Sequence, residues 1–119
     1  MAGLLWVGGV SVGTINYAQN NQYYQLGRLT DDSSFITVNI ASHSEGSSGV
    51  ASIARHYNGN VHKSVIGSIC SCKLFHDANY YIYVYVPSGA LNSMLAVSNK
   101  KGRVAISYNV TLPSDAVEI

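Results

Sequence analysis

Charged residues are scarce in this chain of 119 residues. Lysine, arginine, aspartate and glutamate make up 11% of the sequence, whereas ordinary soluble domains carry about 25%. The seven basic residues exceed the six acidic ones by one, and the longest basic cluster is Lys100-Lys101-Gly102-Arg103. Proteins that bind nucleic acid present a basic stripe, so no nucleic-acid partner is expected. The cluster fits either a phosphate contact or, as we prefer, a solvated strand start or loop.

Long hydrophobic runs are also missing. No segment reaches the roughly 18 apolar residues that a membrane-spanning helix requires, so no membrane insertion is expected. The apolar N-terminus, Met1 to Gly13, lacks a basic start and is interrupted by glycines, which argues against a signal peptide. We expect residues 1–14 to form an N-terminal strand or a lead-in from a longer protein, and residues 1–119 to form one domain.

Cysteine and proline are limited to two residues each. Cys70 and Cys72 are one residue apart, so on a strand they share a face, with Cα atoms about 6.6 Å apart and parallel Cβ vectors. That spacing is near the upper limit for a disulfide, so both are expected to be free and buried, as in a reducing cytosol. Two prolines cannot form a proline-rich linker, and no domain boundary is visible.

The pattern that is present is an alternation of apolar and polar residues with a period of two. Ile36, Val38 and Ile40 share one face of Phe35–Ser42, and Val104–Leu112 repeats this pattern. The fold class predicted is all-β: an antiparallel β-sandwich, jelly-roll-like, with about eight to nine strands. The other expected strands are Leu4–Val12, Tyr23–Leu29, Val50–Tyr57, Val61–Ile66, Ile69–Phe75, Tyr80–Val86 and Leu91–Ser98.

The segments between these strands carry turn-forming residues. Asn58-Gly59-Asn60 predicts a tight hairpin, and Ser44 to Gly49 predicts a flexible polar loop. Residues 88–97 are the best place for a short helical turn, although no window carries a capped helical stripe.

No local catalytic signature is visible, so the chain is expected not to be an enzyme. There is no Gly-x-Ser-x-Gly elbow, and the six acids fall mainly in predicted turns or at the C-terminus. No cofactor and no metal are expected, because the histidines and cysteines match no zinc spacing. His56 and His62 flank the predicted hairpin turn and should be neighbours across it; two polar strand residues are preferred there over a metal site. The other candidate ligands are His43, His76, Cys70 and Cys72.

Three tyrosines, Tyr81, Tyr83 and Tyr85, alternate on one face of a strand whose other face is aliphatic. If the aliphatic face meets the core, the tyrosine face meets solvent, a partner subunit or a ligand. A tyrosine ring offers a flat apolar body with a polar tip, which suits each of these roles. A subunit interface, cross-strand packing on an open sheet face and ligand stacking all remain open.

A second polar and aromatic cluster surrounds the predicted hairpin. Loops on a rigid β scaffold often carry recognition, and an ordinary exposed hairpin is the alternative. We therefore predict a ligand-binding set that joins this cluster to the tyrosine face: Arg55, His56, Tyr57, Asn58, Tyr81, Tyr83 and Tyr85, with Asn60 beside them.

The segment Tyr23-Tyr24-Gln25-Leu26-Gly27-Arg28-Leu29 resembles the opening strand of C-terminal domains of bacteriophage tail fibres and tailspikes. In those domains an alternating strand and a Gly/Ser-rich loop follow, with a late segment similar to Asn79–Val86 and a final alternating strand. The same order runs over residues 15–112.

The resemblance implies a tip domain that trimerises and touches the host surface. The expected partners are two further copies in a homotrimer and a bacterial cell-surface glycan or outer-membrane receptor. The expected location is the virion, after assembly in the host cytoplasm. Two alternatives remain: a trimerisation cap that sets the register of a fibre, and a carbohydrate-binding module of an enzyme.

Overall fold

The computed structural model of the chain describes residues 4–7, 10–18, 21–32, 34–42, 46–69, 71–87 and 93–119. Eleven strands lie in this part of the chain, and it contains no helix that could span a membrane. The strands are β1 (Leu4–Val7), β2 (Val10–Ala18), β3 (Gln22–Arg28), β4 (Phe35–Ser42), β5 (Ser47–Arg55), β6 (Val61–Gly67), β7 (Lys73–His76), β8 (Tyr81–Val86), β9 (Ser93–Lys100), β10 (Val104–Val110) and β11 (Val117–Glu118).

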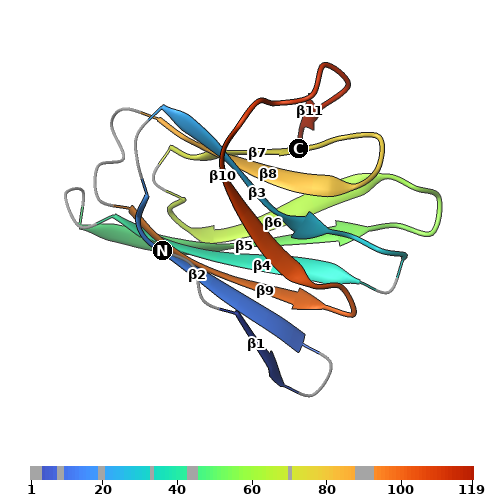
Figure 1. Cartoon of the computed structure of the whole chain (residues 1–119), viewed down its shortest axis with the longest axis horizontal. Helices are drawn as coiled ribbons and strands as arrows, with labels where there is room; N and C mark the ends of the chain where they lie inside the picture. Colours follow the sequence, from blue (N-terminus) through green and yellow to red (C-terminus); the bar gives the residue numbers. More distant parts are fainter. Residues whose placement is uncertain are drawn as a thin grey trace.

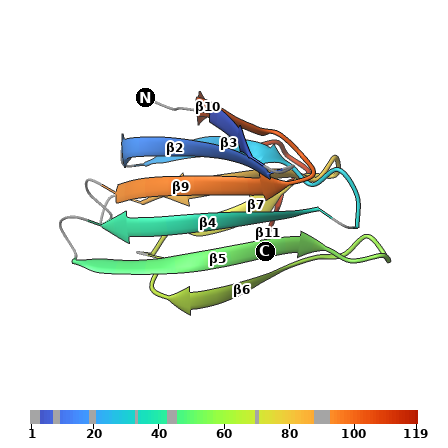
Figure 2. The same cartoon turned by 90° about the horizontal axis from the view of Figure 1, so that it is seen from below.

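The strands form two antiparallel sheets that pack face to face (Figure 1). The larger sheet has the order β1-β2-β9-β4-β5-β6, and the smaller sheet has the order β10-β3-β8-β7-β11. Figure 2 looks onto the larger sheet, with β6 at its lower edge. The predicted class, an antiparallel β-sandwich, is confirmed.

The core lies between the inward faces of the two sheets. Ile36, Val38 and Ile53 of the larger sheet are completely buried, as are Ile82 and Val84 of the smaller one. These residues alternate with polar or aromatic neighbours because successive side chains of a strand point to opposite faces. Burying each such side chain stabilises the fold by about 1.5–3 kcal/mol, so the period-two pattern determines which face of each sheet turns inward.

Several predicted boundaries were wrong. The segment expected as one strand, Leu4–Val12, is a hairpin of β1 and β2, in which Leu4 pairs with Gly13. The strand expected from Ile69 begins only at Lys73, and before it the Cys72 N–H donates to the Ile69 carbonyl. Ser71 there has a φ of 60°. Cys72 is buried as predicted, and Cys70 lies outside the described residues.

The expected helical turn was also wrong where it can be judged. Residues 93–97 belong to strand β9, and residues 88–92 lie outside the described part. Two extra strands explain the difference from the eight or nine expected. One comes from the N-terminal hairpin, and the other is β11, which is only two residues long.

Four connections gather at one end of the sandwich, on the right of Figure 1. We call this end the loop end. It comprises the β3–β4 loop (29–34), the β5–β6 hairpin (56–60), the β7–β8 turn (77–80) and the β9–β10 loop (101–103), together with the strand residues that border them.

Candidate functional site

The β5–β6 hairpin has a closed and well-defined tip. The His56 N–H donates to the Asn60 carbonyl at 2.7 Å, and the Gly59 N–H donates to the His56 carbonyl at 2.9 Å. The Asn58 side chain accepts a further bond from the Asn60 N–H at 3.1 Å. Gly59 has a φ of +89°, which favours glycine. The tight hairpin predicted from Asn58-Gly59-Asn60 is therefore confirmed.

This hairpin is fastened to the β7–β8 turn of the other sheet. The Tyr80 hydroxyl donates to the Gly59 carbonyl at 3.1 Å. The Arg55 guanidinium lies 3.7 Å from the centre of the Tyr80 ring. The His76 ring is nearly parallel to the same ring, with the two ring centres 6.3 Å apart. A cation–π contact of this kind contributes about 0.5–2 kcal/mol. These contacts link the two sheets and restrict movement of the tip.

The outermost side chain of the hairpin is Tyr57, which is 86% exposed. His56, Asn58 and Asn60 beside it are also exposed, and none of the three carries a carboxylate or an ammonium group. The centres of the His56 and His62 rings are 4.4 Å apart, which confirms that the two residues are neighbours across the hairpin. No group of three or more possible metal ligands was found in the described part of the chain.

The tyrosine face of β8 lies on the outer side of the smaller sheet, opposite the buried Ile82 and Val84. Tyr85 contacts Tyr23 on the neighbouring strand, with ring centres 4.7 Å apart. This is a cross-strand aromatic pair, one of the roles left open by the sequence. Tyr81 lies at the loop end, with the Arg28 guanidinium 5.8 Å from its ring centre.

Tyr83 differs from its neighbours because it is only 3% exposed. Its hydroxyl donates to Asp77 Oδ2 at 2.9 Å and accepts from Gln25 Nε2 at 3.1 Å. The other oxygen of Asp77 accepts from the N–H groups of Asn79 and Tyr81. Asp77, itself buried, thus fixes both the β7–β8 turn and the Tyr83 ring.

Burial raises the pKa of Tyr83 above its ordinary value of 10.0, and the nearby Asp77 carboxylate raises it further. The folded state therefore holds this proton more tightly than the unfolded chain does. The resulting stabilisation is complete below pH 10 and is lost as the pH rises through the raised pKa of the folded state.

We expect Tyr83→Phe to remove a tyrosinate absorbance that develops above the ordinary tyrosine pKa. A spectrophotometric titration of the parent and the variant measures this, with Tyr85→Phe as the control on the same face. If the variant loses only absorbance that develops near pH 10, the proposed environment of Tyr83 is wrong.

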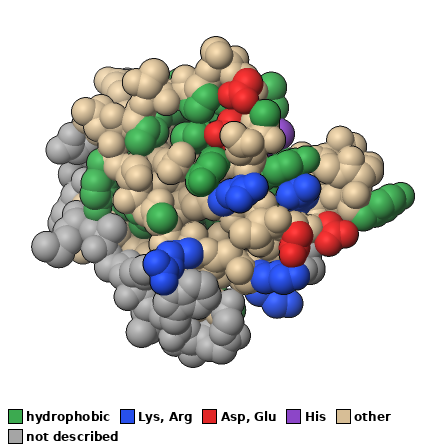
Figure 3. Space-filling model, turned by 45° about the vertical axis from the view of Figure 1, so that its right-hand side comes forward, with side chains coloured by type: hydrophobic (Ala, Val, Ile, Leu, Met, Phe, Trp, Pro, Cys, Tyr) green, Lys and Arg blue, Asp and Glu red, His purple; other side chains and the backbone are tan. Residues whose placement is uncertain are grey.

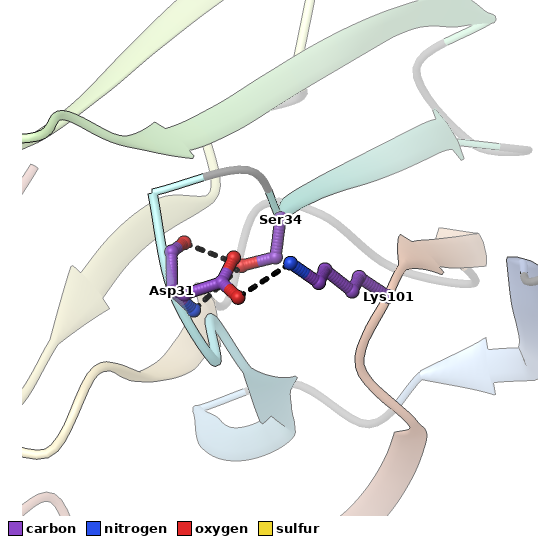
Figure 4. A network of polar contacts seen from close by, with 3 residues as sticks. All are labelled: Asp31, Ser34 and Lys101. Atoms are coloured by element: carbon purple, nitrogen blue, oxygen red, sulfur yellow. Dashed lines mark hydrogen bonds and ion pairs between the residues drawn. The ribbon is translucent and has the colours of Figure 1, made fainter.

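The β3–β4 and β9–β10 loops are joined by an ion pair (Figure 4). Lys101 Nζ lies 2.7 Å from Asp31 Oδ2, and the Ser34 hydroxyl donates to the Asp31 carbonyl at 2.9 Å. Both charged side chains are about half exposed, so the pair contributes at most about 1 kcal/mol. The preferred interpretation of the basic cluster, a solvated loop, agrees with this contact.

Charged side chains of both signs lie close together at the loop end, beside apolar ones (Figure 3). Arg28, Asp31, Arg55 and Lys101 belong to it, whereas Asp77 is buried. The loop end therefore presents charged, polar and apolar groups together.

The outer face of the larger sheet has a depression of about 410 Å³, which was not predicted from the sequence. It lies toward the end opposite the loop end. Its walls combine Asn16, Asn39 and Thr14 with Met94 and Val50, and its lining includes no charged residue. Only the polar, outward position of Asn39 was visible in advance. The hollow arises because the small residues Ala41 and Ala96 lie between longer ones.

Six of the seven predicted site residues fall into two groups in space, and the seventh, Tyr83, is buried. Arg55, His56, Tyr57 and Asn58 meet Tyr80 at the loop end, and Tyr81 is the next residue along the chain. Tyr85 lies four residues further along β8, or about 13 Å away. A ligand role for any of these residues stays a prediction.

Comparison with known proteins gives one structural similarity. No family model matches the sequence, and no curated protein matches it significantly. Among solved structures, the chain is similar to the tailspike protein gp49 from Acinetobacter baumannii bacteriophage Fri1, described as a capsular polysaccharide depolymerase. The TM-score is 0.47 and the identity is 8%, over 99% of this chain but only 21% of that one. A likeness at this level concerns the course of the backbone alone.

Proposed function

We propose that this chain is a non-catalytic recognition domain, which binds a bacterial surface glycan or protein through its loop end. The observation that carries the proposal is the presentation of Tyr57. This ring is 86% exposed on a hairpin that is closed internally and fastened to the opposite sheet through Tyr80. A hairpin that is already held in place loses little backbone entropy on binding, so the contact area of its aromatic side chain converts more efficiently into affinity.

The chemistry around Tyr57 favours a sugar ligand. Tyrosine offers an apolar ring face and a polar tip, and the neighbouring Asn58 and Asn60 offer amide donors and acceptors. Such groups match the apolar faces and hydroxyl groups of a pyranose without requiring opposite charge.

Catalysis is not part of the proposal because three acids in or next to the loop end, Asp31, Asp77 and Asp115, have structural partners. Both oxygens of Asp77 accept hydrogen bonds, Asp31 pairs with Lys101, and Asp115 accepts a bond from the Ala78 N–H. Hydrolysis of a glycosidic bond needs two carboxyl groups that face each other across a substrate. These three carboxyl groups are instead engaged within the fold.

A role as a phage tail-fibre or tailspike tip on the virion is the biological setting that we propose. It is supported by the resemblance of Tyr23–Leu29 and of the segments that follow it to such domains. The homotrimer implied by that resemblance stays a prediction.

Tyr57→Ala is expected to weaken glycan binding by about tenfold or more, because a central aromatic contact contributes about 2 kcal/mol or more. The melting temperature should stay the same, since the ring packs against little of the fold. The measurement is retention of the chain on an array of bacterial surface polysaccharides and on whole bacterial cells.

Tyr108→Ala is the matched control, since Tyr108 is 44% exposed on β10, away from the hairpin. It should leave binding unchanged. Equal binding by Tyr57→Ala and the parent would contradict the proposal, as would failure of the parent to bind any glycan or cell.

A further inference from the structure

The two sheets have four edges, and three of them are poorly suited to pairing with another strand. β1 has four residues, β11 has two, and β10 departs twice from regular register against β3. Short strands and bulges are the usual means by which proteins block edge-to-edge association.

The fourth edge, β6, has none of these features. Its seven residues pair with β5 in one unbroken register, from Arg55–Val61 to Gly49–Gly67. Of the described strands, only β5 pairs with it, and it contains no proline and one charged residue, Lys63. Ile66 is 78% exposed and Val65 is 40% exposed. A regular edge with two exposed aliphatic side chains and a single charge is a template for an added strand.

The hydrogen bonds at the two ends of the hairpin show which groups point outward. The His56 N–H bonds to the Asn60 carbonyl, and the Ser68 N–H bonds to the Ser48 carbonyl. Because bonded and non-bonded pairs alternate in an antiparallel ladder, His62, Ser64 and Ile66 bond to β5. The N–H and C=O groups of Val61, Lys63, Val65 and Gly67 therefore point away from β5.

We propose that β6 pairs antiparallel with β6 of a second copy of this chain, around a twofold axis at Ser64. In this register the outward groups of Lys63 meet those of Val65 in the second copy, so all seven residues find a partner. On the outer face, His62 lies opposite Ile66 of the other copy, which covers this exposed side chain. The contact is isologous and closes at two copies, so this dimer is an alternative to the homotrimer that the resemblance implies.

Charge and the number of paired residues favour this register over the two neighbouring ones. A shift that centres the axis on Lys63 would place two lysines directly opposite each other, which is destabilising. A shift that centres it on Val65 would leave Val61 and His62 without partners. An extended peptide from another protein could use the same edge, but the self-complementary register favours a second copy.

The test is the solution mass of the parent, Val65→Pro and Val65→Thr, measured by light scattering over a wide range of concentration. Proline removes one outward N–H that has no role in the β5 ladder, whereas threonine keeps this group. We expect the parent and Val65→Thr to approach twice the 12.8 kDa mass of the chain. Val65→Pro should remain at the monomer mass.

A parent that stays monomeric throughout, or a trimer that Val65→Pro leaves intact, would overturn the proposal. If Val65→Pro does not fold, amide hydrogen exchange of the parent at several concentrations tests the pairing of β6 instead. Protection at Lys63 and Val65 should rise with concentration, while protection at Ser64 stays constant. Protection at Lys63 and Val65 that does not depend on concentration would also overturn it. Glycan binding is measured separately, so either proposal can fail without the other.

Discussion

Asp77→Ala is expected to destabilise the fold by about 3 kcal/mol and to lower the melting temperature by about 10–15 °C. The carboxylate accepts hydrogen bonds from the N–H groups of Asn79 and Tyr81 and from the Tyr83 hydroxyl. Bonds to a charged acceptor each contribute about 1.5–3 kcal/mol, although their contributions do not add fully. Removing the carboxylate leaves the Tyr83 hydroxyl and two partly buried N–H groups without this acceptor. It also loosens the β7–β8 turn, from which Tyr80 bonds to the β5–β6 hairpin.

Asp115→Ala provides the matched control for this prediction. Asp115 belongs to the same region but is exposed, and it accepts one bond, from the Ala78 N–H at 3.2 Å. We expect it to cost less than about 1 kcal/mol. Thermal and urea unfolding of the parent and both variants measure the difference. Equal destabilisation by the two variants would show that Asp77 does not organise the turn.

Gly49→Ala is expected to cost about 3 kcal/mol, for a steric reason. A Cβ atom on Gly49 would collide with the Ser68 carbonyl oxygen and would lie 2.6 Å from the Ser68 nitrogen. The obstacle is backbone, which cannot rotate away as a side chain can. The end of the β5–β6 ladder must therefore open, and the hydrogen bond from the Ser68 N–H to Ser48 is expected to weaken.

Gly46→Ala separates this clash from a general intolerance of substitution. Gly46 has a φ of +65°, but a Cβ atom there would meet nothing within 4 Å. Only the cost of a left-handed residue applies, about 1 kcal/mol. In urea unfolding, the free energy of unfolding of Gly49→Ala should be clearly lower than that of Gly46→Ala. The reverse order would contradict the close approach of β5 to the chain after β6.

The strands that follow the period-two rule could be predicted from the sequence. Phe35–Ser42 was predicted to the residue, because its inward positions Ile36, Val38 and Ile40 are aliphatic and alternate with more exposed residues. Strand β2 was missed beyond Val12 because its first half breaks this rule. Ser11 and Gly13 lie on its inward side and Val12 on its outward side, and only Thr14 to Asn16 show the usual polarity. Ser11 is tolerated inside because its hydroxyl accepts a hydrogen bond from the Val104 N–H, 93 residues away.

The polar loop expected over Ser44 to Gly49 shows a related difference. Strand β5 begins at Ser47, and residues 43–45 lie outside the described part of the chain. Serine and glycine have low intrinsic preference for strands, but pairing of Ser47 to Gly49 with Ile40 to Ser42 supplies the missing stability.

The exposed hairpin could be predicted from the sequence, but not the contacts that hold it. The composition around Asn58-Gly59-Asn60 indicated an exposed polar hairpin, and Tyr57 is indeed its most exposed side chain. The hydrogen bond from the Tyr80 hydroxyl to the Gly59 carbonyl was not predictable, since the two residues are 21 positions apart and belong to different sheets. The burial of Tyr83 was also missed, because it depends on Asp77 and Gln25, which only the fold brings to the same ring.

The most direct test of a recognition domain without catalysis is a paired measurement on one glycan. The parent chain is incubated with each bacterial surface polysaccharide that it retains on the array, and the reducing ends released are measured beside the amount of chain bound. We predict saturable binding that falls in Tyr57→Ala, with no increase in reducing ends over the polysaccharide alone. Reducing ends that accumulate in proportion to the parent chain would show that it is an enzyme and would contradict the account.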